Sequence, residues 1–193
     1  MEYLEKVKEL LEENMTEKGY KLWNGINKLI PNIWSKPTSS TGKWHRRLNG
    51  EVGADIDEHV YQMLFSTAKL MRMFDIEKKT PRGDSILFAV ALHDALKYGK
   101  LGNRKHTDTM HDKTGADMIA ENKDIFLKII PEEDFYMLEE AVRFHSGKWS
   151  TDAKNNGDFS FKKYNPETMF VHMLDMLSAA DCLKTDMDYK EEE

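Results

Sequence analysis

Hydrophobic residues along this chain recur mainly at the three- and four-residue spacing of amphipathic helices. The pattern predicts helices over residues 3–13, 20–30, 54–74, 111–121, 132–145 and 166–183. Residues 85–97, SILFAVALHDALK, are apolar almost all round, which indicates a helix buried at the centre of the fold. Strand-like alternation is scarce, and FSFKKY (159–164) is the one stretch that favours a short strand. The pattern therefore predicts an all-α helical bundle.

The composition narrows the class of protein. The chain has 193 residues, a net charge of -6, seven His and one Cys. Its acidic balance argues against a long nucleic-acid partner, because such a partner needs concentrated Lys and Arg. No apolar run reaches the roughly 18 residues of a membrane span, and the charged stretch MEYLEKVKELLEEN is unlike a signal peptide. Cys182 has no second Cys to pair with, so these features together predict a single-domain cytoplasmic protein.

The most informative residues are polar groups at positions where the pattern predicts the interior. His93 and Asp94 lie inside the apolar run, and an imidazole buried beside a carboxylate is costly unless both are satisfied. A metal ion would satisfy both; a hydrogen-bonded pair without metal is the alternative. Four further His and Asp residues lie at inward positions of other predicted helices: His59, His111, His145 and Asp175. Such a mixed set suits Zn, Mn, Fe or Co, and Mg where carboxylates dominate.

A polar loop precedes the first of these histidines. Ser hydroxyls and Gly amides can cradle a phosphate, and Trp44 can stack on a base. As a substrate-binding loop it would contribute Ser39, Ser40, Lys43, His45 and Arg46. The alternative is an ordinary surface loop with one anchoring Trp, and Trp149 is interpreted as core or rim packing.

The ordered set of polar residues resembles the HD-domain superfamily of metal-dependent phosphohydrolases, in its two-metal branch with the pattern H…HD…H…H…D. The residues that carry the resemblance are His59, His93, Asp94, His111, His145 and Asp175. ALHDALKYG resembles the HD-x-x-K signature, with Lys97 as the lysine, and VHMLDMLSA (171–179) resembles the closing VH-x-x-D-x-L-x-S helix. HDKTGA (111–116) and VRFHSG (142–147) resemble the segments of the third and fourth histidines.

The resemblance covers about residues 34–183. PTSSTGKWH followed by GEVGADIDEHV resembles a lead-in of some members, although this chain has Gly50 and Gly53 and no adjacent glycine pair. The implied organisation is a helical extension over residues 1–33, an HD domain over residues 34–185 and an acidic tail over residues 186–193.

The resemblance also implies roles for the residues. Two divalent ions (Mn, Fe, Co, Ni, Zn or Mg) bind, with Asp94 as the bridge between them. His59, His93 and Asp175 complete one ion, and His111 and His145 complete the other. A metal-bridged hydroxide attacks phosphorus, and Lys97 neutralises charge on the bound phosphate. Asp94 and Lys97 are thus the implied catalytic residues; a solvated surface position is the alternative for Lys97.

Three alternatives stay open within the ligand set. His106 is a rival to His111, and Asp181 is a rival to Asp175. His172, three residues before Asp175, either supports a ligand or packs as an ordinary histidine.

The implied activity is hydrolysis of a phosphoester, with a lean towards phosphodiesters, in a nucleotide or a small nucleotide-derived substrate. An HD-like di-iron oxygenase uses the same ligand types, and a non-catalytic nucleotide-binding module is a further alternative. The expected partner is a small phosphorylated molecule, with neither a long nucleic acid nor a membrane. The amphipathic N-terminal helix packs either on its own core or on a second chain, so a homo-oligomer stays open.

Overall fold

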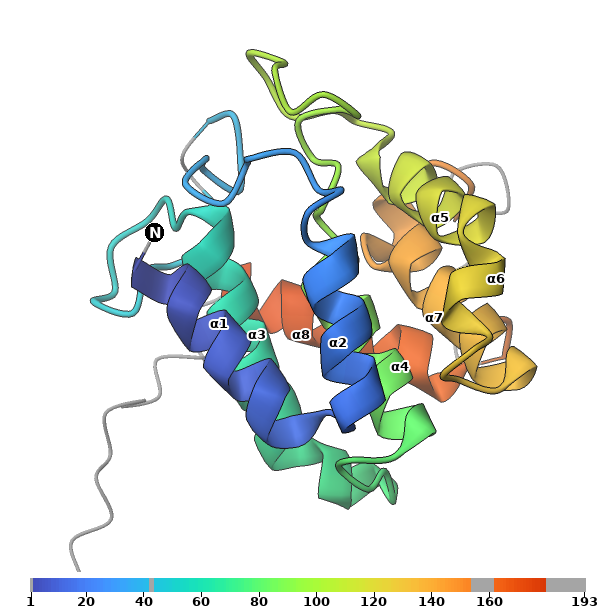
Figure 1. Cartoon of the computed structure of the whole chain (residues 1–193). Helices are drawn as coiled ribbons and strands as arrows, with labels where there is room; N and C mark the ends of the chain where they lie inside the picture. Colours follow the sequence, from blue (N-terminus) through green and yellow to red (C-terminus); the bar gives the residue numbers. More distant parts are fainter. Residues whose placement is uncertain (1, 42–43, 154–161, 180–193) are drawn as a thin grey trace, which may run out of the picture.

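The computed structural model describes residues 2–41, 44–153 and 162–179. Figure 1 shows their helices in chain order. They are α1 (Glu2–Asn14), α2 (Glu17–Ile26), α3 (Ile56–Leu70), α4 (Pro81–Leu92), α5 (His111–Glu121), α6 (Lys123–Phe126), α7 (Glu132–Phe144) and α8 (Pro166–Ala179), with the 3-10 helices η1 (Met71–Phe74) and η2 (Gly147–Trp149). The described residues form no strand beyond two isolated bridges, so the all-α prediction is confirmed.

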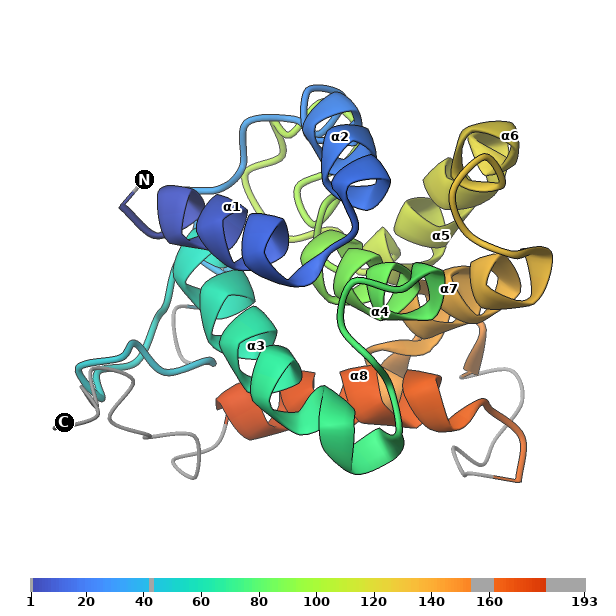
Figure 2. The same cartoon turned by 60° about the horizontal axis from the view of Figure 1, so that its bottom comes forward.

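Helix α4 lies at the centre of the bundle, as its apolar run predicts. Thr80 caps its N-terminus by accepting a hydrogen bond from the Gly83 amide, and Pro81 occupies the first turn. Every residue from Gly83 to Leu92 is buried, and α4 contacts α1, α2, α3, α7 and α8 (Figures 1 and 2). The residues that directly follow α4 in the chain therefore begin in the interior of the protein.

The end of α4 differs from the prediction of a helix to residue 97. The α-helix ends at Leu92, and the chain continues as tight turns in which the Ala95 amide bonds the Leu92 carbonyl at 3.0 Å. The His93 side chain donates to the Val90 carbonyl at 2.7 Å. The imidazole thus pairs a carbonyl of the last helical turn, where the helix itself leaves carbonyls without partners. His93 and Asp94 consequently lie in a turn at the end of the central helix.

Other boundaries shift for local reasons. Helix α2 begins at Glu17 because Thr16 accepts from the Gly19 amide, and it ends at Ile26, before turns that lead to Pro31. The predicted helix 54–74 divides into α3 and η1 and stops at Asp75, which is left-handed with φ 55°. The short α6 was not predicted, since four residues carry too little periodicity. Residues 159–161 of the predicted strand lie outside the described residues, and residues 162–164 turn and bend.

The N-terminal helices share the core of the rest of the bundle. Val7 and Leu11 of α1, which packs along α3, and Trp23 of α2 belong to the same buried cluster as Phe88. At the α1–α2 junction, the Thr16 amide donates to Asp84 of α4 at 2.8 Å. The proposed boundary after residue 33 stays a prediction, and the tail 186–193 lies outside the described residues.

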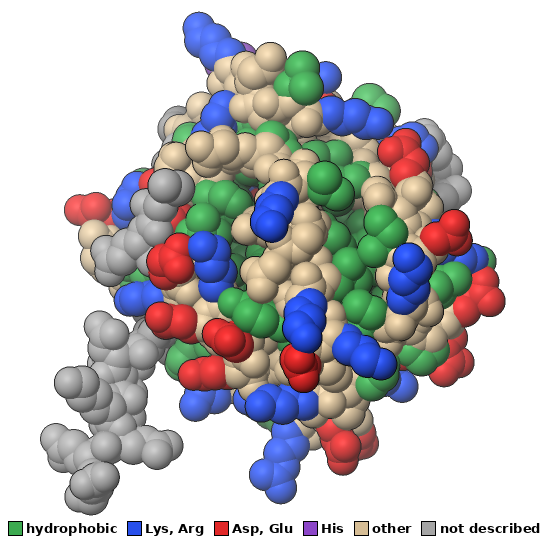
Figure 3. Space-filling view, viewed as in Figure 1, with side chains coloured by type: hydrophobic (Ala, Val, Ile, Leu, Met, Phe, Trp, Pro, Cys, Tyr) green, Lys and Arg blue, Asp and Glu red, His purple; other side chains and the backbone are tan. Residues whose placement is uncertain are grey.

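The surface seen in Figure 3 mixes basic and acidic side chains with scattered apolar ones, without a continuous basic patch on that face. No helix among the described residues is long and apolar enough to cross a membrane.

Candidate metal centre

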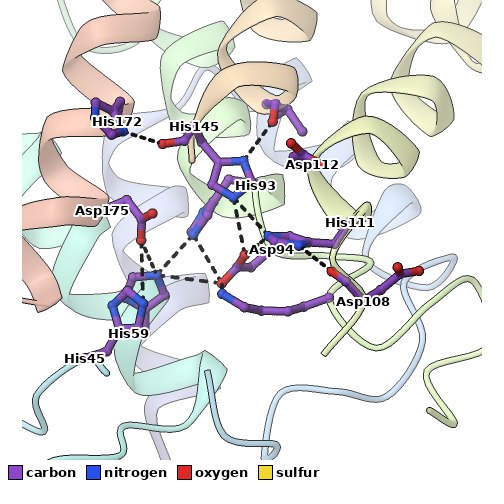
Figure 4. Close-up of polar contacts among 12 residues, drawn as sticks. His45, His59, His93, Asp94, Asp108, His111, Asp112, His145, His172 and Asp175 are labelled. Atoms are coloured by element: carbon purple, nitrogen blue, oxygen red, sulfur yellow. Dashed lines mark hydrogen bonds and ion pairs between the residues drawn. The ribbon is translucent and has the colours of Figure 1, made fainter. Parts of the chain in front are cut away.

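The six predicted ligands come from five segments and meet at one place. His59 lies in the first turn of α3, His93 and Asp94 follow α4, and His111 begins α5. His145 follows the last residue of α7, and Asp175 belongs to α8. Figure 4 shows their side chains converging. His59, His93, Asp94 and His145 are at most 1% exposed.

One group of donor atoms, which we name the first ligand set, comprises Nε2 of His59 and of His93, Oδ2 of Asp94 and Oδ1 of Asp175. The two Nε2 atoms lie 3.0 Å apart. His59 Nε2 is 3.4 Å from Asp175 Oδ1, and His93 Nε2 is 3.5 Å from Asp94 Oδ2.

The second ligand set comprises Oδ1 of Asp94 and Nε2 of His111 and of His145. The two Nε2 atoms lie 3.2 Å apart. Asp94 Oδ1 is 3.2 Å from His111 Nε2 and 3.6 Å from His145 Nε2. Asp94 therefore lies between the two sets and turns one carboxylate oxygen towards each.

Backbone carbonyls fix the tautomer of three of these histidines. In each, the Nδ1–H group donates at 2.7 Å to the carbonyl three residues earlier: His93 to Val90, His111 to Asp108, and His145 to Val142. A neutral imidazole protonated at Nδ1 presents an unprotonated Nε2. The Nε2 lone pairs of all three thus point into the centre, as metal ligation requires.

Ser178 performs the same task for His59. Its hydroxyl donates to the Asp175 carbonyl at 2.7 Å, which leaves its lone pairs to accept from His59 Nδ1 at 3.1 Å and from His45 Nδ1 at 2.9 Å. Ser178 was not among the predicted site residues. The signal was available in the segment VHMLDMLSA, whose serine corresponds to the last position of the motif that it resembles.

The protein alone leaves this cluster unsatisfied. Among the described residues, Asp94 Oδ1 and Asp175 Oδ1 are buried without a hydrogen-bond partner. Two facing Nε2 lone pairs also repel unless something lies between them. Two ligand atoms held at about 2.1 Å from one ion lie roughly 3–3.5 Å apart, close to the spacings within both sets. The residues therefore fit metal cations, which would supply the missing partners.

Burial and charge set the protonation of the ligands. Burial alone would raise the pKa of Asp94, but Lys97 and His93 hold that pKa well below its usual range. Burial would also raise the pKa of Asp175, but His59 and His45 hold that pKa well below its usual range. Burial lowers the pKa of His59 and of His145, so both are neutral at pH 7. These groups are in the protonation states that bind metal.

His93 is the exception among the buried imidazoles. Burial would lower its pKa, but the adjacent Asp94 carboxylate outweighs burial and raises the pKa. Lys97 adds a second charge contact to Asp94, with Nζ 2.6 Å from Oδ2. The solvated surface alternative for Lys97 is therefore wrong, because its side chain is only 12% exposed.

A cavity of about 440 Å³ opens onto the centre. Residues of both ligand sets line it together with Ser39, His45 and Lys97 of the predicted substrate site. Ser40 and Arg46 do not line it: the Ser40 hydroxyl bonds the Thr107 hydroxyl at 2.8 Å, and an Arg46 guanidinium nitrogen donates to the Gly50 carbonyl. Lys43 lies outside the described residues.

Two tryptophans border this cavity. Trp44 is 60% exposed and Trp149 is 52% exposed, and both belong to its lining. Trp149 thus lies on the rim of the cavity, and the sequence had predicted either core or rim packing for it. A cavity of similar size beside Arg72, Asp75 and Ile76 contains none of the six ligands.

The three alternative residues His106, Asp181 and His172 differ in where they lie. His106 is exposed and belongs to none of the potential metal-binding groups among the described residues, whereas His111 belongs to one. Asp181 lies outside the described residues. His172 donates from Nδ1 to the His145 carbonyl at 2.7 Å and packs against Gly147, where a Cβ would lie 2.3 Å from the imidazole. It therefore supports the backbone of His145.

Comparisons with protein-family models, with curated proteins and with solved structures found no match to this chain.

Proposed function

We propose that this protein is an HD-type, metal-dependent phosphohydrolase that cleaves a phosphoester bond, preferentially a phosphodiester, of a nucleotide or small nucleotide-derived molecule. The observation that carries the proposal is Asp94, which turns Oδ1 towards one pair of histidines and Oδ2 towards another. A carboxylate between two such sets is typical of two-metal hydrolytic sites.

The two ligand sets would each hold one divalent ion. When bound, the ions supply positive charge that polarises a phosphoryl oxygen and activates water for attack. The carbonyl partners of His93, His111 and His145 hold the three Nε2 atoms in the orientation needed to receive the ions. The chain itself would therefore contribute a ligand cage whose imidazoles are already oriented.

Lys97 would contribute charge from the protein side. Its ammonium group borders the cavity next to Asp94, and its side chain is only 12% exposed. Negative charge on a phosphoryl group builds up during transfer, and a fixed cation in such a site stabilises it more than the same cation in water. Lys97 is consequently the best candidate among the side chains for stabilising the transition state.

The cavity walls favour a small aromatic phosphoester. A volume of about 440 Å³ lies in the range of small-molecule sites, roughly 300–1,000 Å³. The hydroxyls of Thr38, Ser39 and Ser146 can donate to phosphate oxygens, and the exposed indoles of Trp44 and Trp149 can stack on a base. The mixed charge of the face in Figure 3 offers no track for a long polyanion.

The proposal is tested by a panel of metals crossed with a panel of substrates. Metal-free protein is reloaded with Mn, Co, Ni, Zn, Fe or Mg and incubated under nitrogen with nucleoside mono- and triphosphates, cyclic nucleotides and dinucleotides. Release of a hydrolysis product, read by chromatography, with at least one metal is the expected result. Coloured protein that turns over only with O₂ would instead indicate a di-iron oxygenase, and nucleotide binding without turnover would indicate a binding module.

A further inference from the structure

We propose that His45 is an additional metal ligand, which joins the first ligand set and makes the two metal positions unequal. This inference rests on the metal-binding part of the proposed function. The sequence suggests His45 only as a substrate-binding residue, and its place in the fold points to a different role.

His45 is buried although its loop is on the surface. It is 8% exposed, whereas its neighbour Trp44 is 60% exposed. Its backbone is left-handed, with φ 58°, a conformation that is uncommon outside Gly, although His adopts it more often than most residues do. The strain of such a residue, roughly 1–3 kcal/mol, persists only where the surroundings enforce it.

Hydrogen bonds on both sides enforce this conformation. The His45 carbonyl accepts from the amides of Gly53 at 2.9 Å and of Ala54 at 3.3 Å. The next residue, Arg46, donates its amide to the Ser178 carbonyl at 3.2 Å and accepts at its own carbonyl from Gln62 at 2.8 Å. The backbone is thus tied to α3 and α8, and the imidazole projects inward between them.

The orientation of the imidazole matches that of the four predicted histidine ligands. His45 Nδ1 donates to Ser178, the acceptor that it shares with His59, so Nε2 is the unprotonated nitrogen. That Nε2 lies 3.9 Å from Asp175 Oδ1, an atom without a hydrogen-bond partner. Figure 4 shows the two imidazoles side by side beneath Asp175, with ring centroids 4.2 Å apart. A cation between this lone pair and the carboxylate oxygen would be a partner for both.

The shared neighbours identify which ion His45 would bind. Ligand atoms of His45, His59 and Asp175 all lie within 4.8 Å of one another. The one Nε2 lone pair of His59 serves a single ion, so His45 shares the ion of the first ligand set. That position then has five candidate protein donors, from His45, His59, His93, Asp94 and Asp175, in two groups that share His59. The second has three, and a site with fewer protein donors keeps places for water and substrate.

The direct test uses unaltered protein. Cobalt(II) shifts the NMR signals of protons close to it, and the Nδ1–H protons of ligand histidines exchange slowly because each is hydrogen-bonded. Protein loaded with Co(II) should show five shifted, exchangeable signals, one each for His45, His59, His93, His111 and His145. Four signals would overturn the inference and leave the metal centre intact, whereas no Co(II) binding would overturn the proposed function itself.

A variant gives a second measurement. His45→Asn retains a residue that tolerates a left-handed backbone, and exposed His106→Asn is the matched control. Calorimetric titration of metal-free protein with Co(II) should resolve a tight and a weak site. The His45→Asn substitution should weaken the tight site by roughly 10–100-fold or more and leave the weak site unchanged. Unchanged affinity at both sites, with a raised KM, would make His45 a substrate-binding residue instead.

Discussion

The chain contains two His-Asp pairs, and the structure uses them in opposite ways. His93-Asp94 follows the end of α4, and His111-Asp112 begins α5. The two histidines behave alike, since each donates from Nδ1 to the carbonyl three residues earlier at 2.7 Å and turns Nε2 towards the centre. The two aspartates are equally buried, at 1% exposure each.

The aspartates differ in what surrounds their oxygens. Asp112 accepts from the Lys113 amide at 2.8 Å, from the Thr151 hydroxyl at 2.8 Å and from the Thr151 amide at 2.5 Å. Asp94 leaves Oδ1 without a partner, and Figure 4 draws no contact between Asp112 and the cluster. Burial is therefore no mark of a ligand; an acceptor that the protein leaves unfilled is the more informative feature.

The largest predicted effect separates these two aspartates. Asp94→Asn removes the ionised carboxylate that faces both ligand sets, whereas Asp112→Asn alters an anchor outside them. We expect Asp94→Asn to lower metal content and turnover by at least a hundred-fold, since residues outside a ligand set already cost roughly 10–100-fold. Asp112→Asn should retain two ions per chain in metal analysis. Two ions retained by Asp94→Asn would contradict the assignment.

The two aspartates also differ in the residue that stands three positions later in the chain. Asp94 has Lys97 there, and Asp112 has Gly115, whose added Cβ would lie 3.3 Å from Val142. We expect Lys97→Met to keep both ions and to lower kcat by roughly 10²–10³-fold, the cost of removing one group that stabilises a transition state. Exposed Lys100, paired with Glu121, provides the control Lys100→Met, which should leave kcat unchanged. Loss of metal from Lys97→Met would show that Lys97 instead supports the ligands.

A smaller effect, on the free energy of unfolding, is expected when Asp112 loses one hydrogen-bond donor. Thr151→Val removes the hydroxyl that donates to this carboxylate and retains the amide that also does so. The free energy of unfolding should fall by roughly 1–3 kcal/mol, because the charged acceptor loses a donor. Urea denaturation measures this change, and metal content should stay at two ions per chain. A loss of metal without a loss of stability would contradict the structural role of Asp112.

The smallest predicted effect is on the pH dependence of stability and concerns another buried carboxylate, Asp84. Like Asp112, Asp84 accepts hydrogen bonds from the protein. Burial raises the pKa of Asp84, although hydrogen bonds from Thr16 oppose the change. The folded chain therefore holds this proton at pH values where the unfolded chain has released it, so rising pH lowers the free energy of unfolding. The window runs upward from the ordinary value of 3.8 to the raised pKa.

Asp84→Asn removes this titration. Urea denaturation of metal-free protein at several pH values gives the stability of each form, and the advantage of the unaltered chain over the variant should shrink as pH rises through that window. Asp75→Asn, at the exposed end of η1, is the matched control for the loss of one carboxylate. A constant difference between unaltered protein and Asp84→Asn would mean that the carboxyl pKa is the same in both states.

Much of the fold follows from local pattern. Helices α5 and α7 occupy nearly the predicted ranges, because their apolar residues repeat at helical spacing. The hydrophobic pattern predicted helix ends less well, because side chains bind backbone groups there. Thr16 accepts from the Gly19 amide at the start of α2, and His93 donates to the Val90 carbonyl at the end of α4. The six predicted ligands lie at the inward positions that the same periodicity indicates.

The sequence alone determined an all-α chain and a set of His and Asp residues that face its interior, because helical periodicity is a local property. Tertiary structure decided which of these residues come together in one cluster. Ser178 bonds His59 and His45, 119 and 133 positions away, and no local spacing encodes that meeting. It also decided that Asp94 faces the cluster while Asp112 faces Thr151, since the pairs stand at opposite ends of their helices. Local chemistry supplies the candidates, and the packing of α3, α4, α5, α7 and α8 selects among them.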